Sequence, residues 1–418
     1  MGKPKIRFKG YNDEWEQRKL GDILISLQNN TLSRADLSNE TGVAKNVHYG
    51  DVLIKFGEVL DVSKEKLPMI SDESVLLKYK ASFLKNGDVI VADTAEDTTV
   101  GKCSEIAGLD DEIVLSGLHT IPYRPVEKFA SGYLGYYLNS SAYHNQLIPL
   151  MQGIKVTSVS KSAMQSTNII YPKSKEEQAK IGSYFQSLDR LITLHQRKCD
   201  EMKTLKKYML QKMFPQNGQK IPEIRFEGFT GEWEQRKCKD IFDRVSKAVD
   251  VEAGEVYREI GIRSHGKGLF YKDEITGEGL GNKRVFWVEP NSFILNIVFA
   301  WERAVTKTTE KELGMIASHR FPMYKPKENV ADLDYITKFF ITHKGKYILE
   351  MASPGGAGRN KTLGQKEFEN STICLPSYEE QKKIGRYLEV FDHLITLHQR
   401  KCDKLKSIKK FMLQNMFV

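Results

Sequence analysis

One glycine-rich segment of the sequence has residue types that could hold a phosphate group. Gly355-Gly-Ala-Gly-Arg-Asn-Lys-Thr362 is similar to the loops that cradle nucleotide phosphates, but such a loop needs glycine directly before its lysine, and Asn360 stands there. We therefore do not expect nucleotide binding. The sequence also contains no Gly-x-Gly-x-x-Gly turn after a strand, no Gly-x-Ser-x-Gly elbow, no His-Glu-x-x-His pair and no Asn-Pro-Pro-Tyr or Asp-Pro-Pro-Tyr run. No catalytic constellation is predicted.

Two histidine–cysteine pairs have a spacing that could bind a metal. His195-x-x-x-Cys199 and His398-x-x-x-Cys402 each place both side chains on one face of a helix, and two such helices could supply a His₂Cys₂ zinc site. The alternative is that both pairs lie on the contact face of paired helices, where a polar histidine fixes the register. We favour the second interpretation and predict no metal.

Basic residues in loops form a third group, suited to binding a polyanion. Lys155 and Arg359 occupy equivalent places when two segments are aligned back from Pro172 and Pro376, which also places Thr157 opposite Lys361. A basic residue beside a glycine-bearing loop suits a phosphate contact, because glycine lets the backbone approach closely. The full set of candidates is Lys155, Lys161, Arg263, Lys267, Arg359, Asn360 and Lys361. A plain solvated loop is the alternative for each.

The composition places these residues in an ordinary globular protein. The chain has 418 residues, which predicts two to four domains, and its formal charge is +9. It has five cysteines without a Cys-x-x-Cys pair, which disfavours a disulfide framework and a zinc ribbon. No apolar run is long enough to span a membrane and the N-terminal residues do not form a signal peptide, so we expect a cytoplasmic protein without membrane contact.

The chain is an internal duplication. Ile6-Arg-Phe-Lys-Gly and Glu14-Trp-Glu-Gln-Arg-Lys19 recur as Ile224-Arg-Phe-Glu-Gly and Glu232-Trp-Glu-Gln-Arg-Lys237. Residues 176–214 recur at 379–417, with 26 of 39 positions identical at an offset of 203. The segments between the repeats, 20–175 and 238–378, show little similarity to each other. Two matching frames around unlike contents indicate two modules that recognise different things.

Each repeated block is predicted to form one long helix with an apolar contact face. The face follows a heptad period, which favours a coiled coil, and both copies skip a step of the pattern at Lys206 and Lys409. Leu191, Leu194 and Leu205 lie off this face and indicate a further packing surface. The residues expected to pair the helices are Ile181, Phe185, Leu188, Ile192, His195, Ile384, Leu388, Phe391, Ile395 and His398.

The segments between the helices are predicted to be mixed α and β. Val52-Leu-Ile, Asp88-Val-Ile-Val-Ala and Ser292-Phe-Ile-Leu-Asn are expected strands, and each segment closes on a strand before proline, at 168–172 and 372–376. Residues 133–144 and 335–349 are expected helices. The charge surplus is +3 and +4 on the two long helices but 0 and +2 on residues 1–175 and 217–375. Any polyanion-binding face on these segments must therefore be a local patch.

This arrangement resembles the specificity subunit of a type I restriction-modification enzyme. The resemblance covers the whole chain and rests on two variable segments alternating with two repeated helices. It rests also on the Pro…Glu-Glu-Gln-x-Lys-Ile-Gly run that starts each helix, at Pro172–Gly182 and Pro376–Gly385. It implies an α+β fold with two target-recognition domains, 1–175 and 215–378. It further implies two spacer helices, 176–214 and 379–418, paired in an antiparallel coiled coil with pseudo-two-fold symmetry.

The resemblance also implies function and partners. Such a subunit is not itself an enzyme and carries no cofactor. Each variable domain reads one half of a split sequence in double-stranded DNA, and the seven loop residues above become candidate DNA contacts. Two methylation subunits using S-adenosylmethionine, and restriction subunits using ATP and Mg²⁺, join it. Two other classes stay open: a coiled-coil adaptor with two protein-binding heads, and a self-sufficient DNA enzyme.

Overall fold

The computed structural model of the chain describes residues 2–216, 218–355 and 361–418. It divides into two compact units, the first made of residues 1–195 and 400–418 and the second of residues 196–399. Each unit therefore combines one globular segment with a part of two 38-residue helices, α7 (Lys175–Lys212) and α13 (Tyr378–Asn415).

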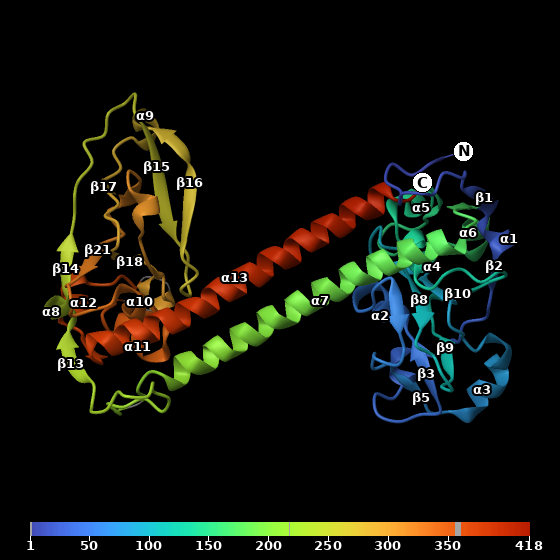
Figure 1. The fold of residues 1–418 in the computed structure, drawn as a ribbon, viewed down its shortest axis with the longest axis horizontal. Coiled ribbons are helices and arrows are strands. Elements are labelled where there is room, and N and C mark those ends of the chain that lie inside the picture. The colour runs from blue at the N-terminus through green and yellow to red at the C-terminus, as the bar shows by residue number, and fades with distance from the viewer. Residues whose placement is uncertain (1, 217, 356–360) are drawn as a thin grey trace. The chain divides into compact units, whose positions relative to one another are not determined.

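The first unit is built around a mixed parallel and antiparallel five-stranded sheet of order β2-β10-β6-β8-β4, of which Figure 1 labels β2, β8 and β10. A three-stranded sheet, β5-β3-β9, and the pairs β1-β12 and β11-β7 complete its strands among the described residues. The strands are β1 Glu16–Lys19, β2 Leu24–Ser26, β3 Ala44–Val47, β4 Val59–Asp61, β5 Met69–Ile70, β6 Val89–Ala92, β7 Thr94–Ala95, β8 Cys103–Ala107, β9 Val114–Ser116, β10 Thr120–Pro125, β11 Thr157–Ser158 and β12 Asn168–Tyr171. The helices are α1 Leu20–Ile23, α2 Tyr49–Ile54, α3 Glu73–Tyr79, α4 Tyr133–Leu138, α5 Ser141–His144 and α6 Lys161–Gln165, with 3₁₀ turns η1 Arg34–Asp36, η2 Lys80–Ser82 and η3 Ile148–Leu150.

The second unit has two four-stranded sheets of order β14-β21-β18-β19 and β16-β15-β20-β17, and the pair β13-β22. Its strands are β13 Glu234–Lys237, β14 Phe242–Val245, β15 Val256–Ile262, β16 Leu269–Thr276, β17 Val285–Trp287, β18 Phe293–Leu295, β19 Val305–Lys307, β20 Ile316–Ser318, β21 Met323–Pro326 and β22 Thr372–Leu375. Its helices are α8 Cys238–Ile241, α9 Gly277–Leu280, α10 Leu333–Ile341, α11 His343–Met351 and α12 Gln365–Asn370, with 3₁₀ turns η4 Ala300–Glu302 and η5 Glu310–Glu312. Its long hairpin, β15–β16, has no counterpart of that length among the described strands of the first unit.

The repeated sequences form equivalent parts of the two units. In the first unit β1 pairs antiparallel with β12, the strand that leads into α7. In the second unit β13, which has the same Glu-Gln-Arg-Lys sequence, pairs in the same way with β22 before α13. Trp15 and Trp233, just before these strands, are both buried in the cores of their units. The duplicated segments therefore close each globular segment onto the start of its long helix.

The two long helices run antiparallel in both units. In the first unit the Cys402 thiol lies 4.0 Å from the carbonyl of Ile192, and the rings of Phe185 and Phe417 stack with centroids 5.7 Å apart. Residue numbers thus fall along α7 as they rise along α13. In the second unit the Cys199 thiol lies 3.8 Å from the carbonyl of Ile395, and Lys206 bonds Asp392, so residue numbers again rise along α7 as they fall along α13. The expected α+β fold with an antiparallel helix pair is confirmed.

Three of the predicted elements are wrong. Val52-Leu-Ile, predicted as a strand, belongs to helix α2, in which Val52 is buried and Ile54 is exposed. His48 accepts a hydrogen bond from the backbone N–H of Gly50 and so caps this helix. The prediction considered only the apolar run and did not include this capping residue. The two predicted helices at 133–144 and 335–349 each break in two, giving α4 and α5, and α10 and α11.

Polar residues at equivalent positions cause the two breaks. Ser140 lies in extended conformation before α5, and its hydroxyl donates to the carbonyl of Tyr137. Thr342 donates to the carbonyl of Phe339 and accepts from the N–H of Gly345. Each side chain satisfies backbone groups that a continuous helix would have paired internally, so one helix ends and the next begins.

Candidate nucleic-acid interface and paired helices

An arginine–glutamate clamp joins the repeated N-terminal segment to the long helix in each unit. The guanidinium of Arg7 donates to both carboxylate oxygens of Glu177, at 2.7 and 2.9 Å. Arg225 donates to Glu380 in the same way, at 2.7 and 2.8 Å. The two glutamate side chains are only 2% and 1% exposed. A bidentate pair of this kind fixes orientation as well as distance, so each helix starts at a defined angle to its globular segment.

The glutamine after each clamp glutamate joins three backbone segments. Gln178 donates to the carbonyl of Pro172, at the end of β12, and accepts from the N–H of Ala130, just before α4. Gln381 donates to Pro376 and accepts from the N–H of Asp332. The run Pro…Glu-Glu-Gln is therefore a structural joint between a strand, a short helix and the long helix.

The residues predicted to pair the helices divide between the two cores. Ile181, Phe185 and Leu188 are buried in the first unit, and Ile384, Leu388 and Phe391 in the second. Ile395 is partly buried against the second core. Ile192, His195 and His398 are half-buried. By contrast Leu191, Leu194 and Leu205 are exposed, so the additional apolar face that they were predicted to form is uncovered.

A reciprocal pair of salt bridges explains why the heptad pattern skips a step at Lys206 and Lys409. In the first unit the ammonium of Lys409 on α13 lies 2.6 Å from Asp189 on α7. In the second unit Lys206 on α7 bonds Asp392 on α13. Asp189 and Asp392 are the same residue of the repeated block. At this heptad position each helix therefore has an ion pair to the opposite helix in place of an apolar contact. In the sequence this position is visible only as a missing apolar residue.

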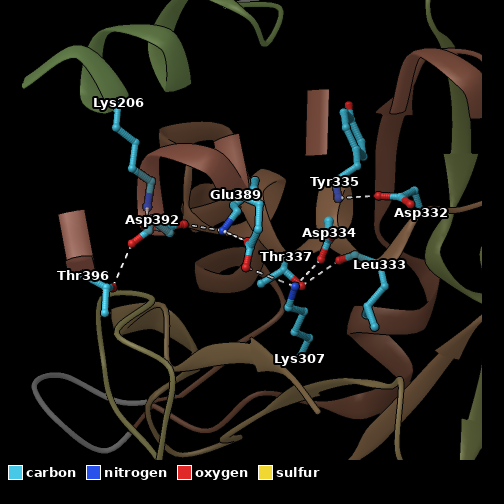
Figure 2. Close-up of polar contacts among 11 residues, drawn as sticks. Lys206, Lys307, Asp332, Leu333, Asp334, Tyr335, Thr337, Glu389, Asp392 and Thr396 are labelled. Carbon is cyan, nitrogen blue, oxygen red and sulfur yellow. Dashed lines mark hydrogen bonds and ion pairs between the residues drawn. The ribbon is translucent and has the colours of Figure 1, made fainter. Parts of the chain in front are cut away.

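In the second unit this pair extends into a network of charged side chains, which Figure 2 shows. Asp392 bonds both Lys206 and Lys338 of α10, and Glu389 lies 2.7 Å from Lys338 and 3.4 Å from Lys307. Burial alone would raise the pKa of Asp392, but the two ammonium groups hold its pKa below the ordinary value. In the first unit the position of Lys338 is taken by Tyr136, whose hydroxyl donates to Asp189 at 2.6 Å.

The candidate contacts of the first unit lie on one exposed loop and at the start of the helix α6 that follows it. Lys155 is exposed between Ile154 and Val156, which are exposed too, and β11 anchors the loop by pairing with β7. Lys161 is exposed at the first position of α6, which Ser160 caps. The structure therefore presents both lysines to solvent on a short segment.

Of the candidate contacts of the second unit, the structure describes Arg263, Lys267 and Lys361. Arg263 packs over the ring of Phe270 and donates to the carbonyl of Leu269, which ties it to its own hairpin. Lys267 is exposed at the tip of that hairpin loop. Lys361 lies 5.9 Å from the ring of Trp301 in η4. Arg359 and Asn360 lie outside the described residues.

Two backbone hydrogen bonds match the alignment of the two variable segments. The N–H of Val159 donates to the carbonyl of Asp93 at 2.9 Å, and the N–H of Leu363 donates to Ile297 at 2.8 Å. Val159 and Leu363 are the buried positions that the sequence alignment equated. The chain segments that carry Lys155 and Arg359 therefore precede equivalent anchor points, next to the strands β6 and β18.

The cysteines do not form part of a metal-binding cluster within the described residues. All five cysteines are buried. Across residues 2–216, 218–355 and 361–418, no group of three or more His, Cys, Asp and Glu side chains is placed to hold a metal ion. In the same ranges, none of the helices has the length and apolar composition that crossing a bilayer requires.

Known proteins similar to this chain share one description. The family described as the type I restriction modification DNA specificity domain matches residues 12–204 and 230–407. A protein of Methanocaldococcus jannaschii named as a type I restriction enzyme MjaX specificity subunit is 23% identical, over 95% of this chain and 91% of its own length. The crystal structure of a type I restriction-modification system S subunit from M. genitalium has the same fold. It has 13% identity and a TM-score of 0.61, over 100% of this chain and 99% of that one.

Proposed function

Because the chain belongs to the family of type I restriction-modification DNA specificity subunits, we propose that its two globular segments, 1–175 and 215–378, are separate target-recognition domains. Each domain reads one half of a split target in double-stranded DNA. The subunit has no catalytic role of its own. S-adenosylmethionine, ATP and Mg²⁺ are bound by its partner subunits.

One observation supports this proposal most strongly: the two globular segments are attached to their helices in the same way but contain different β-sheets. The clamps Arg7–Glu177 and Arg225–Glu380 attach both globular segments to their helices in the same manner. Between the clamps, the second unit has two four-stranded sheets, whereas the first has a five-stranded and a three-stranded sheet. Because the attachment is common and the contents differ, each unit can contact a different DNA sequence in a similar orientation to its helix.

The helices α7 and α13 form the spacer, and two methylation subunits dock on them. The exposed side chains Leu191, Leu194 and Leu205 support this, since they leave apolar surface uncovered on the repeated helices. Restriction subunits join the assembly, which acts in the cytoplasm.

The DNA contacts are proposed for the seven basic or polar loop residues. The candidate DNA contacts are Lys155, Lys161, Arg263, Lys267, Arg359, Asn360 and Lys361, and of these Lys155 and Arg359 are assigned to phosphates. Lys155 and Arg359, each changed to Ala, should weaken binding to all sequences alike and reduce the salt slope by about one. If either change altered the methylated sequence instead, that residue would read bases.

Domain exchange tests the division of labour. Residues 20–175 are replaced by the corresponding segment of another specificity subunit, and the methylated sequence is mapped in cells that also express the methylation subunit. We expect one half of the methylated sequence to change and the other half to stay. A change in both halves would contradict separate reading. An adaptor with protein-binding heads would bind no duplex DNA, and a self-sufficient enzyme would methylate without the partner.

A further inference from the structure

A groove in the second unit has the shape and charge of a binding site for an extended anion. It encloses about 980 Å³. The last turns of α7 form one wall, and the loop that joins β15 to β16 and the junction of α10 with α11 form the other. Leu210, Phe214, Ile341 and Ile395 provide its apolar lining. All of these segments lie between residues 196 and 399, within one compact unit.

The charged groups that line the groove are almost all cationic. Its charged side chains are Lys203, Lys206, Lys207, Lys212, Lys267, Arg303, Lys344 and a single carboxylate, Asp392. Asp392 is occupied by Lys206 and Lys338, and Lys203 and Lys212 bridge Asp200 and Glu223. Within the described residues, the other four cations have no carboxylate partner. The near-neutral composition of this segment therefore conceals a local basic site.

Two turns that line the groove place non-glycine residues in the left-handed region of backbone conformation. His265 and Arg303 have φ angles of 63° and 60°, in the left-handed region that costs a non-glycine residue free energy. The turns are joined to each other, because the N–H of His265 donates to Glu302 at 2.8 Å and the N–H of Gly266 donates to Arg303 at 2.9 Å. A side chain on Gly266 would collide with Ile341.

The guanidinium of Arg303 is positioned by a backbone carbonyl and has N–H donors that make no hydrogen bond within the described residues. One of its terminal nitrogens donates to the carbonyl of Ile341 at 3.2 Å. Its Nε is buried and lacks a hydrogen-bond partner among the described residues. An arginine that is positioned by a neutral carbonyl, with donors left over, keeps its charge available for an anion in the groove.

The first unit lacks part of this charge at the corresponding place. Ser140 and Thr342 precede α5 and α11, so Ser141 and Ala142 correspond to His343 and Lys344. Lys207 by contrast has an identical counterpart in the repeated block, Lys410. The lysine at the α10–α11 junction, Lys344, thus has no basic counterpart in the first unit.

We propose that this groove binds the sugar–phosphate backbone of duplex DNA beside the sequence that the second unit reads, with Lys207, Lys267, Arg303 and Lys344 contacting phosphates. This rests on the proposed function. Several cations spread along one groove suit a row of phosphates, and the apolar lining suits deoxyribose. Since phosphate contacts carry no sequence information, the groove increases affinity for every DNA equally.

Two charge-matched double variants test the groove. Lys207→Ala/Lys344→Ala removes two of its cations, and Lys247→Ala/Lys366→Ala removes two from the same unit at positions that do not line it. Each is purified as the complex with methylation subunits. Its affinity for a duplex carrying the methylated sequence and for an unrelated duplex is measured by fluorescence anisotropy over a range of salt concentrations.

We expect the groove variant to reduce the salt slope by about two, at ~0.9 for each lost phosphate contact. If the lines for wild type and variant meet near 1 M salt, this corresponds to roughly thirtyfold weaker binding at 0.15 M, for both duplexes alike. The control variant should keep nearly the wild-type slope. An equal loss in the control, an unchanged slope, or a loss confined to the target duplex would overturn the proposal.

Two further outcomes are distinguishable from these. If the groove variant no longer bound the methylation subunits while DNA affinity per complex stayed unchanged, the groove would hold an acidic protein surface, and the proposal would be wrong. If the wild-type complex did not prefer its target over the unrelated duplex, the proposed function itself would fail, whatever the groove variants do.

Discussion

Asp392→Asn should destabilise the second unit more than Asp189→Asn destabilises the first, although the two residues are equivalent in the repeated helix. Asp392 accepts from Lys206 and from Lys338, whose side chain is only 9% exposed. Because asparagine is neutral, the substitution leaves the ammonium groups of Lys206 and Lys338 without the carboxylate of Asp392. A hydrogen bond to a charged group contributes about 1.5–3 kcal/mol, but Asp392 is 35% exposed and Glu389 still contacts Lys338. We expect a total loss of about 2 kcal/mol.

The expected loss for Asp189→Asn is smaller, about 1 kcal/mol. Asp189 has one ammonium partner, Lys409, which keeps its second carboxylate, Glu58, at 2.8 Å. The hydroxyl of Tyr136 can still donate to the asparagine carbonyl. Hydrogen exchange measured by mass spectrometry on the amides of α10 and α4 reports the two units separately, so each variant is compared with wild type in its own unit.

The pH dependence of the Asp392 effect has a definite sign. Because the folded-state pKa of Asp392 is lowered, its carboxylate stabilises the folded state above the unfolded pKa of about 3.9. That contribution is lost as the pH falls through the lowered folded pKa. Wild type and Asp392→Asn should therefore differ at neutral pH and converge in acid.

A second substitution tests whether an orphaned charge is the cause. Lys338→Met, added to Asp392→Asn, removes the buried ammonium that lost its partner and should recover part of the stability. If Lys338→Met destabilised the Asp392→Asn variant as much as it destabilises the wild type, the two residues would act independently. That result would refute the reasoning.

Three further expectations follow from other parts of the structure. Burial raises the pKa of Glu105 to about 7. The protonated carboxyl therefore stabilises the first unit below about pH 4.5, and this contribution is lost as the pH rises through 7. Denaturant midpoints should thus show wild type losing at most about 3 kcal/mol relative to Glu105→Gln between pH 4 and 8. Equal pH profiles would contradict a buried carboxyl whose desolvation outweighs the hydrogen bonds that it accepts from the N–H groups of Gly132 and Gly135. Arg225→Met leaves the buried Glu380 without its bidentate partner and should cost about 3–5 kcal/mol in urea unfolding, whereas Arg236→Met, in an exposed pair, should cost under about 1 kcal/mol. Leu194→Glu/Leu205→Glu changes exposed side chains and should leave the melting temperature unchanged while preventing copurification of the methylation subunit; retained binding would remove these residues from the docking surface.

The sequence by itself determined the duplication, the two long helices and the unlike segments between them. These features are local or repetitive: a heptad period and an identical block 203 residues apart are visible without any tertiary contact. It also placed the strand before each proline correctly, at β12 and β22. It failed where a single capping residue overrides an apolar pattern, as at His48 in α2 and at Thr342 between α10 and α11.

Only the tertiary structure decided which distant side chains meet. Arg7 and Glu177 are 170 residues apart, and no spacing rule connects them, because their contact depends on how a strand pair closes a whole globular segment onto a helix. The skipped heptad position at Lys206 became interpretable when the direction of the helices placed it beside Asp392. The basic groove is assembled from five separate segments of one unit. Its charge is cancelled in the composition by acidic residues elsewhere, so it could not be read from the sequence.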